Sequence, residues 1–195
     1  FYIIASIGFL FLMIQSYKLL SNNLKTENQK YRLVLKDALF EIRFYPSATF
    51  AIIYSSGTDY KSVSSSGFRK LAGYIFGGND QGKSISMTAP VRMEMSDKGS
   101  SMSFVMPEKY KESDLPKPKD ASVQIVKSIP QYVAVISFGG YADDETIQEN
   151  RNLLLKLIQK KGIKVTGEYS FLGYNAPFQF WGRKNEVVIP IDWKE

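Results

Sequence analysis

The sequence predicts an α+β fold in which duplicated β-rich halves form a curved, barrel-like sheet, mixed or antiparallel, with two packed helices. Strand-like segments outnumber helical ones, which is typical of such folds. The halves, residues 31–106 and 121–195, share the order strand, strand, helix, strand, strand, and a proline-rich connector at 107–120 joins them. Short sequences repeat as well, since AIIYSSG in the first half parallels AVISFGG in the second.

Residues 1–20 precede this domain and are predicted to form a membrane-spanning signal-anchor helix. The first fourteen residues, FYIIASIGFLFLMI, contain no charge, and Lys18 follows where its side chain can reach lipid headgroups. A spanning helix needs about 20 apolar residues, so this run also fits a retained signal peptide or a helix of a soluble domain. We expect a single-pass membrane protein, with residues 21–30 as a polar linker.

The side of the membrane on which the domain lies stays open at this point. Four cations follow the predicted helix and favour cytoplasmic placement by the positive-inside rule: Lys18, Lys25, Lys30 and Arg32. Residues upstream of Phe1 would change that balance.

Three strands and one helix are predicted in the first part of the domain. The strands are rich in β-branched and aromatic residues and lie at 31–35, 39–45 and 48–56. A helix begins near Asp59, where apolar residues follow a 3.6-residue spacing, and ends before Gly77. Strand character resumes at 85–95 and 101–107.

The second half repeats this order after the connector, which we expect to be exposed because it holds three prolines among many charges. Strands are predicted at 123–127, 132–140, 163–174 and 186–192. The helix between the second and third of these has Asp143 or Asp144 as its N-cap and ends at Lys160-Lys161-Gly162.

Two residue types are missing from the chain, and their absence excludes several kinds of site. Without cysteine there is no disulfide, thiolate metal site or cysteine nucleophile. Without histidine there is no Ser-His-Asp catalysis, and the commonest metal ligand is lost. No nucleophile–base pair can be placed, so we expect no enzyme activity, no catalytic residues and no protein-held metal ion.

The net charge of +6 does not predict a nucleic-acid partner. Residues 1–30 hold three lysines against one glutamate, so the rest of the chain carries only +4. Nucleic-acid-binding proteins concentrate basic residues on one face or helix, whereas no basic run here is longer than two residues.

Two motifs each have a structural and a functional interpretation. Thr88-Ala89-Pro90 interrupts a strand with a residue that lacks an N–H group. This interruption indicates either a bulge or sheet edge, or a break that opens a cleft beside the first helix. Residues 174–187, YNAPFQFWGRKNEV, crowd aromatic side chains in a turn. They form either a packed corner or an exposed platform for a flat apolar ligand.

Six motifs occur in order over residues 31–192: FEIRFYP, FRKLAGYIFGGN, ISMTAPV, the P-x-P of the connector, FGGYAD and YNAPFQFWGRKNEV. Together they resemble the SOUL haem-binding family. The resemblance implies a barrel-like fold of two repeated β-rich halves with one helix each. It also implies a shallow apolar cleft for a tetrapyrrole, between the first helix and the loop before the last strand.

Carried over by position, the resemblance places this cleft on Phe68, Arg69, Leu71, Ala72, Ile75, Tyr174, Pro177, Phe178, Gln179, Trp181 and Arg183. Basic residues of the family are thought to meet the propionates of haem, and the candidates here are Arg69, Lys70 and Arg183. Some relatives offer a histidine to the iron, which this chain lacks. We therefore expect apolar contact and propionate pairing without strong protein ligation of iron.

The sequence thus predicts a membrane-anchored haem- or tetrapyrrole-binding protein that buffers or transfers its ligand. Its expected partners are haem or another flat amphipathic molecule and the membrane, with no nucleic acid. The alternative is an accessory subunit of a membrane protein complex, with a vestigial ligand cleft.

Overall fold

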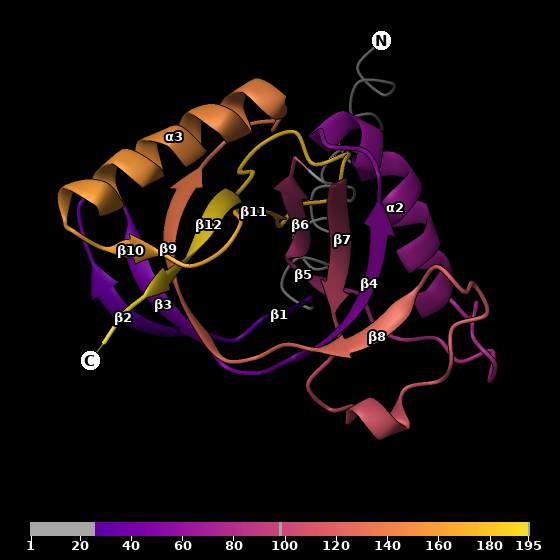
Figure 1. Ribbon diagram of the computed structural model, residues 1–195. Helices are drawn as coiled ribbons and strands as arrows, with labels where there is room; N and C mark the ends of the chain where they lie inside the picture. Colours follow the sequence, from indigo (N-terminus) through magenta and orange to yellow (C-terminus); the bar gives the residue numbers. More distant parts are fainter. Residues whose placement is uncertain (1–25, 98, 195) are drawn as a thin grey trace, which may run out of the picture.

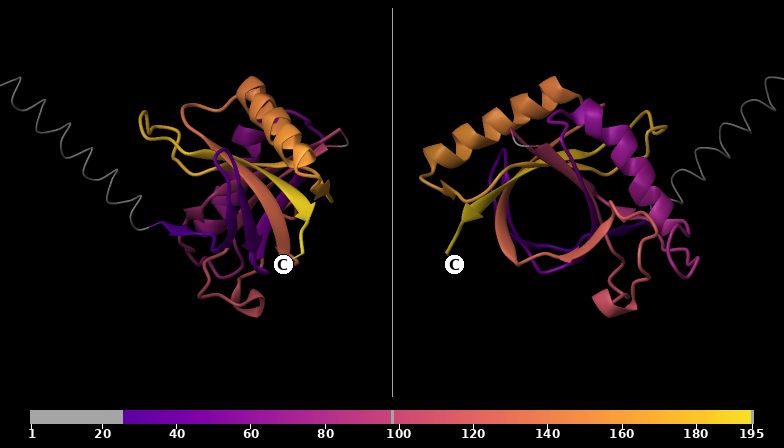
Figure 2. Two further views of the ribbon diagram at one scale, coloured as in Figure 1. Left: turned by 90° about the vertical axis from the view of Figure 1, so that its left-hand side faces the viewer. Right: turned by 45° about the vertical axis from the view of Figure 1, so that its right-hand side comes forward.

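The computed structural model describes residues 26–97 and 99–194. Within them, one large sheet curls into an incomplete barrel, and two helices lie on its outside (Figures 1 and 2). The strands of this sheet are β2 (Arg32–Lys36), β3 (Glu41–Tyr45), β4 (Thr49–Ser55), β6 (Val91–Ser96), β7 (Gly99–Val105), β8 (Gln124–Lys127), β9 (Gln131–Phe138), β10 (Lys164–Val165), β11 (Ser170–Gly173) and β12 (Asn185–Asp192). The helices are α2 (Tyr60–Ile75) and α3 (Asp144–Lys160). The α+β class and the curved sheet are confirmed.

Every strand pair of the large sheet is antiparallel, so the mixed alternative is excluded for it. The strand order is β2-β3-β9-β12-β11-β6-β7-β4-β8, with β10 beside β12. The run β3-β9-β12-β11 therefore has the same arrangement as β8-β4-β7-β6, and the two runs meet at β11 and β6. The halves exchange strands, because β3 of the first half pairs with β9, with β2 beside it, and β8 of the second half pairs with β4.

The helices follow the same pseudo-symmetry. Helix α2 packs on β4 and β7, and α3 packs on the equivalent strands β9 and β12. Asp143 caps α3 as predicted, since its side chain accepts a hydrogen bond from the Thr146 amide at 2.8 Å. The next residue, Asp144, accepts from the amide of Tyr60 at 2.7 Å and so caps α2. The N-termini of the two helices are thus joined directly.

The main hydrophobic core lies between the sheet and the helices. Side chains alternate between the two faces of a strand, so on β12 Val187 and Ile189 enter this core while Val188 points to the other face. That inner face carries a smaller apolar cluster: Tyr45, Val133, Val135, Leu172 and Val188. The barrel therefore has a filled interior in addition to the core beneath the helices.

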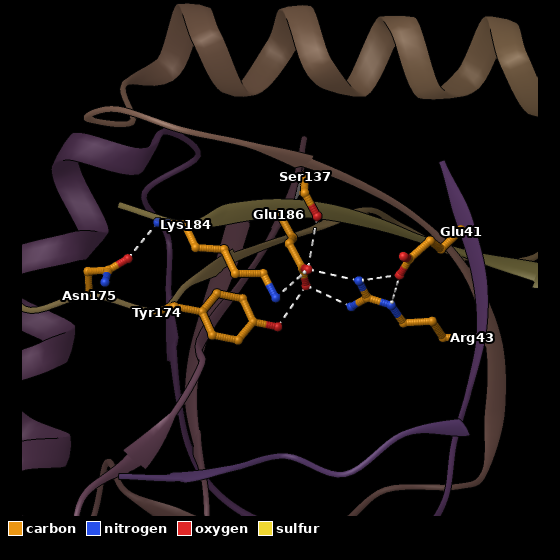
Figure 3. Close-up of polar contacts among 7 residues, drawn as sticks. All are labelled: Glu41, Arg43, Ser137, Tyr174, Asn175, Lys184 and Glu186. Carbon is orange, nitrogen blue, oxygen red and sulfur yellow. Dashed lines mark hydrogen bonds and ion pairs between the residues drawn. The ribbon is translucent and has the colours of Figure 1, made fainter. Parts of the chain in front are cut away.

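A buried ion pair lies on the inner face and joins the two halves (Figure 3). Arg43 of β3 donates to both oxygens of the Glu186 carboxylate of β12, each at 2.9 Å. The residues are 2% and 0% exposed. Glu41 accepts from Arg43 Nε at 2.8 Å, and the Tyr31 ring lies 4.1 Å from the guanidinium carbon. Because a lone buried charge is costly, each partner requires the other.

The connector is packed more closely than its composition predicts. It contains the short 3-10 helix η1 (Glu112–Asp114), and Leu115 is buried. The hydroxyl of Tyr74, at the end of α2, donates to the Pro116 carbonyl at 3.0 Å. The neighbouring glycine-rich loop is held by the fully buried Asn79, whose amide group bonds the backbone of Tyr74 and Lys83.

The structure differs from the sequence predictions for the linker at residues 21–30 and for membrane localisation. Within the linker, β1 (Glu27–Asn28) forms a parallel pair with β5 (Thr88–Ala89), so this part is structured. The predicted spanning helix at residues 1–20 lies outside the described residues. Among the helices of residues 26–97 and 99–194, none is long and apolar enough to cross a bilayer. The single-pass membrane localisation is accordingly withdrawn.

Replacing Tyr74 with Phe should lower the free energy of unfolding by about 1 kcal/mol, because the hydrogen bond to the connector is lost while the buried ring remains. Urea unfolding of Tyr74→Phe measures this, with Tyr54→Phe, at a largely exposed tyrosine, as the matched control. Equal midpoints for the two variants would contradict the packing described for the connector.

The Arg43–Glu186 pair should make the protein lose stability in acid. Burial by itself raises the pKa of Glu186, but the hydrogen bonds and charge of Arg43 outweigh burial and hold this pKa below its usual 4.5. As the pH falls, the Glu186 carboxylate is protonated in the unfolded chain before it is protonated in the folded protein. The stabilisation from the ion pair is therefore complete above pH 4.5 and disappears as the pH falls through the lowered pKa of Glu186. Urea unfolding of wild type and Glu186→Gln over this range should give a shallower pH dependence for the variant. Parallel curves would refute the prediction.

Candidate functional site

A groove lies between α2 and the loop that connects β11 to β12, here called the aromatic loop (residues 174–184). It consists of two adjoining hollows with volumes of about 380 and 300 Å³. Both hollows are lined by Phe68 of α2, by Val91 and Gly173 of the sheet, and by Asn175 and Pro177 of the loop. The groove therefore lies on the helix side of the sheet, where β6 of one half meets β11 of the other.

The first hollow extends towards the N-terminus of α2. Besides the shared residues, it is lined by Tyr60, Ser64, Ser65, Met93, Met102, Tyr141, Phe171, Arg183 and Asn185. The second hollow extends towards β5, with Thr26, Met87, Thr88, Ala89, Tyr174, Ala176, Phe178 and Gln179 in its walls. Aromatic, methionine and aliphatic side chains thus dominate the lining, with polar side chains in both hollows and the cation Arg183 in the first, as in many small-molecule sites.

Only one half of the molecule has the loop needed for this groove. In the first half β6 turns directly into β7, with Ser96 paired to Gly99. In the second half, the equivalent strands β11 and β12 are separated by the aromatic loop. The pseudo-symmetry of the sheet is therefore broken where the groove forms.

Arg183 is the cation in the wall of the first hollow. Its Nη1 donates to the carbonyls of Ala176 and Gln179, both at 2.9 Å, which shapes the loop. Its guanidinium carbon lies 4.4 Å from the centre of the Tyr141 ring. Its Nε is buried and finds no acceptor among the described residues. A positive charge with hydrogen-bonding capacity left over favours an anionic group on a ligand.

Tyr60 adds a neutral hydrogen-bonding group to the same end of the groove. Its ring packs edge-on against Phe171, with 5.3 Å between ring centres. Burial raises the pKa of the Tyr60 hydroxyl above 10, although the charge of Arg183 opposes this. The hydroxyl therefore stays protonated at neutral pH and is able to donate a hydrogen bond.

The structure brings six of the predicted site residues to the groove. These are Phe68, Tyr174, Pro177, Phe178, Gln179 and Arg183. Leu71 and Ile75, assigned to the cleft from the resemblance, are instead fully buried in the main core. Arg69, Ala72 and Trp181 belong to neither hollow. Lys70, a candidate propionate partner, bonds Ser122, two residues after the connector, and lines neither hollow.

Several groove residues were missed from the sequence. Tyr60, Tyr141 and Phe171 come from three separate segments, and no local motif marks them. A signal did exist for the second hollow, because the Thr88-Ala89-Pro90 interruption was noted as a break beside the first helix. Thr88 and Ala89 now line that hollow, and they also form the short edge pair with β1. The motif therefore lies both at a short strand pair and in the wall of the second hollow.

Comparisons with known proteins agree with this fold. The chain is 33% identical over 160 residues to Heme-binding protein 2 of Mus musculus, covering 77% of each chain. It is 28% identical over 160 residues to Heme-binding protein 1 of Bos taurus, covering 78% of this chain and 83% of the relative. The solved C-terminal domain of EcmrR is similar in fold alone, with a TM-score of 0.63 at 8% identity over 84% of this chain and 99% of that domain.

The family model described as SOUL heme-binding protein matches residues 26–190, which is nearly all of the chain that the structure describes. The match includes both helices and the aromatic loop. The chain therefore belongs to the SOUL heme-binding protein family.

Proposed function

We propose that this protein binds haem or a related tetrapyrrole in the groove and buffers or transfers it. The observation that carries the proposal is the groove itself, an apolar site of two adjoining hollows with a cation at one end. Family membership supports the same ligand class, since the relatives are named as haem-binding proteins. The proposed role is binding and not catalysis.

The residues present fit such a ligand. Haem supplies a flat apolar macrocycle with two propionates and an iron atom. Phe68, Pro177 and Phe178 would contact the macrocycle, and hollows of about 300 and 380 Å³ are of the size that holds small molecules. The Arg183 guanidinium, which lines the first hollow, would pair with a propionate, and the Tyr60 hydroxyl is close enough to Arg183 for the two to interact electrostatically.

Strong coordination of iron by this chain is not part of the proposal. The chain has no histidine. Met93 and Met102 line the floor of the first hollow, but both are buried in the main core and serve there as packing residues. Binding through apolar contact and one cation permits release, which suits buffering or transfer. No observation on the described residues favours the alternative of an accessory subunit.

Replacing Phe178 with Ala should weaken haemin binding about tenfold, because an apolar contact worth about 1–2 kcal/mol is lost. Phe180→Ala is the matched control, since Phe180 is 71% exposed and lies outside both hollows, whereas Phe178 is 59% exposed and lines one. Absorbance titration with haemin measures both. Equal affinities for the two variants would remove the aromatic loop from the proposed site.

Replacing Arg183 with Gln should also weaken haemin binding about tenfold and make the affinity less sensitive to salt, because an ion pair with a propionate is lost. Arg69→Gln removes the same charge from a residue outside the groove and should leave the affinity unchanged. Titrations at low and high ionic strength measure this. If Arg69→Gln had the larger effect, the cation of the site would lie on α2 and not on the loop.

A further inference from the structure

Side chains at both ends of the aromatic loop contact the carboxylate of Glu186, which does not line the groove. Glu186 lies two residues beyond the loop, on the inner face of the sheet and fully buried. The Tyr174 hydroxyl donates to its Oε2 at 2.7 Å. The Lys184 ammonium lies 3.0 Å from its Oε1. Figure 3 shows the two side chains reaching the carboxylate from the side opposite to Arg43.

The two ends of the loop are also bonded to each other. The Tyr174 amide donates to the Lys184 carbonyl at 3.3 Å, and the Lys184 amide donates to Asn175 Oδ1 at 2.6 Å. The Lys184 ammonium lies 4.3 Å from the centre of the Tyr174 ring. The base of the loop is therefore a closed set of contacts in which Tyr174 and Lys184 each touch the other and Glu186.

The hydrogen bonds that Arg183 donates within the loop have a different effect from the contacts to Glu186. Arg183 bonds the carbonyls of Ala176 and Gln179, which belong to the same loop. These bonds determine the shape of the loop, but they would move with it. The contacts to Glu186 differ because Glu186 is held from outside the loop, by Arg43 of β3 and by Ser137 of β9.

We propose that Glu186 is a positioning residue for the ligand groove. It does not line either hollow, and it acts through Tyr174 and Lys184, which hold the loop wall at a fixed distance from α2. Hydrogen bonds to an ionised acceptor in a buried site are stronger than neutral ones, so a carboxylate at this position holds the loop better than a neutral group would. Ligand affinity then depends on a side chain that the ligand never touches.

The test uses substitutions that cut the links to the loop and leave the ion pair with Arg43 in place. Tyr174→Phe keeps the ring and removes only the hydroxyl, and Lys184→Met keeps the stem and removes the charge. Each should speed amide hydrogen exchange at positions 174 and 184 about tenfold, as expected for one lost charge-assisted bond. Exchange in α3 and β9 should not change. Lys184→Arg should restore slow exchange.

Ser137→Ala is the matched control, because it removes a different bond to the same carboxylate, at 3.0 Å, that does not lead to the loop. It should leave exchange at positions 174 and 184 as in the wild type. If Tyr174→Phe and Lys184→Met also exchange as the wild type does, or if Ser137→Ala speeds exchange as much as they do, the positioning role is refuted.

A second readout rests on the proposed function. Haemin affinity should fall about fivefold in Tyr174→Phe and in Lys184→Met, and Lys184→Arg should recover it. A wild type that does not bind haemin would overturn the proposed function, while the exchange data would still decide the role of Glu186. Normal haemin binding by all variants, with faster loop exchange, would show that the loop position does not control affinity and would overturn the inference.

Discussion

The buried pair of Arg43 and Glu186 is the interaction on which the arrangement of this molecule depends. It spans 143 residues of sequence and joins a strand of the first half to the last strand of the second. Neither charge is stable in the barrel interior without the other, so the pair forms only when β3, β9 and β12 are correctly registered. The same carboxylate then bonds Tyr174 and Lys184, which extends its effect from the barrel to the loop beside the groove.

The groove is a consequence of how the two halves combine. One wall is a helix of the first half, the other is a loop of the second half, and the floor is where β6 and β11 meet. Strand exchange between the halves fixes this junction, and the direct cap between Asp144 and the amide of Tyr60 fixes the adjacent helix ends. Among the described residues the groove forms in the second half, because β11 and β12 are separated by the aromatic loop, whereas the equivalent strands β6 and β7 are joined by a short turn.

The chemistry of the groove follows from residues that are absent as much as from those present. Without histidine, the binding that we propose would rely on apolar area, the Arg183 guanidinium and the protonated Tyr60 hydroxyl. Such contacts recognise a flat amphipathic molecule by its shape and its charged edge, and they do not require coordination of a metal ion by the protein. Placement of the walls then matters more than any single contact, which is why a carboxylate behind the loop can influence the site.

Local elements could be predicted from the sequence: α2 begins one residue after the predicted Asp59, and α3 has its predicted cap at Asp143. The strands occur in the predicted order, but the predicted strands 85–95 and 163–174 are each divided into two. The resemblance to the SOUL family, carried by short motifs, implied a cleft between the helix and the loop that flank the groove. The side of α2 that faces the groove became clear from the packed structure, in which Leu71 and Ile75 lie in the core and Tyr60 lies at the site. The tertiary structure alone paired Arg43 with Glu186, because periodicity defines the faces of an element but not what covers them, and contacts between distant strands exist only once the sheet has closed.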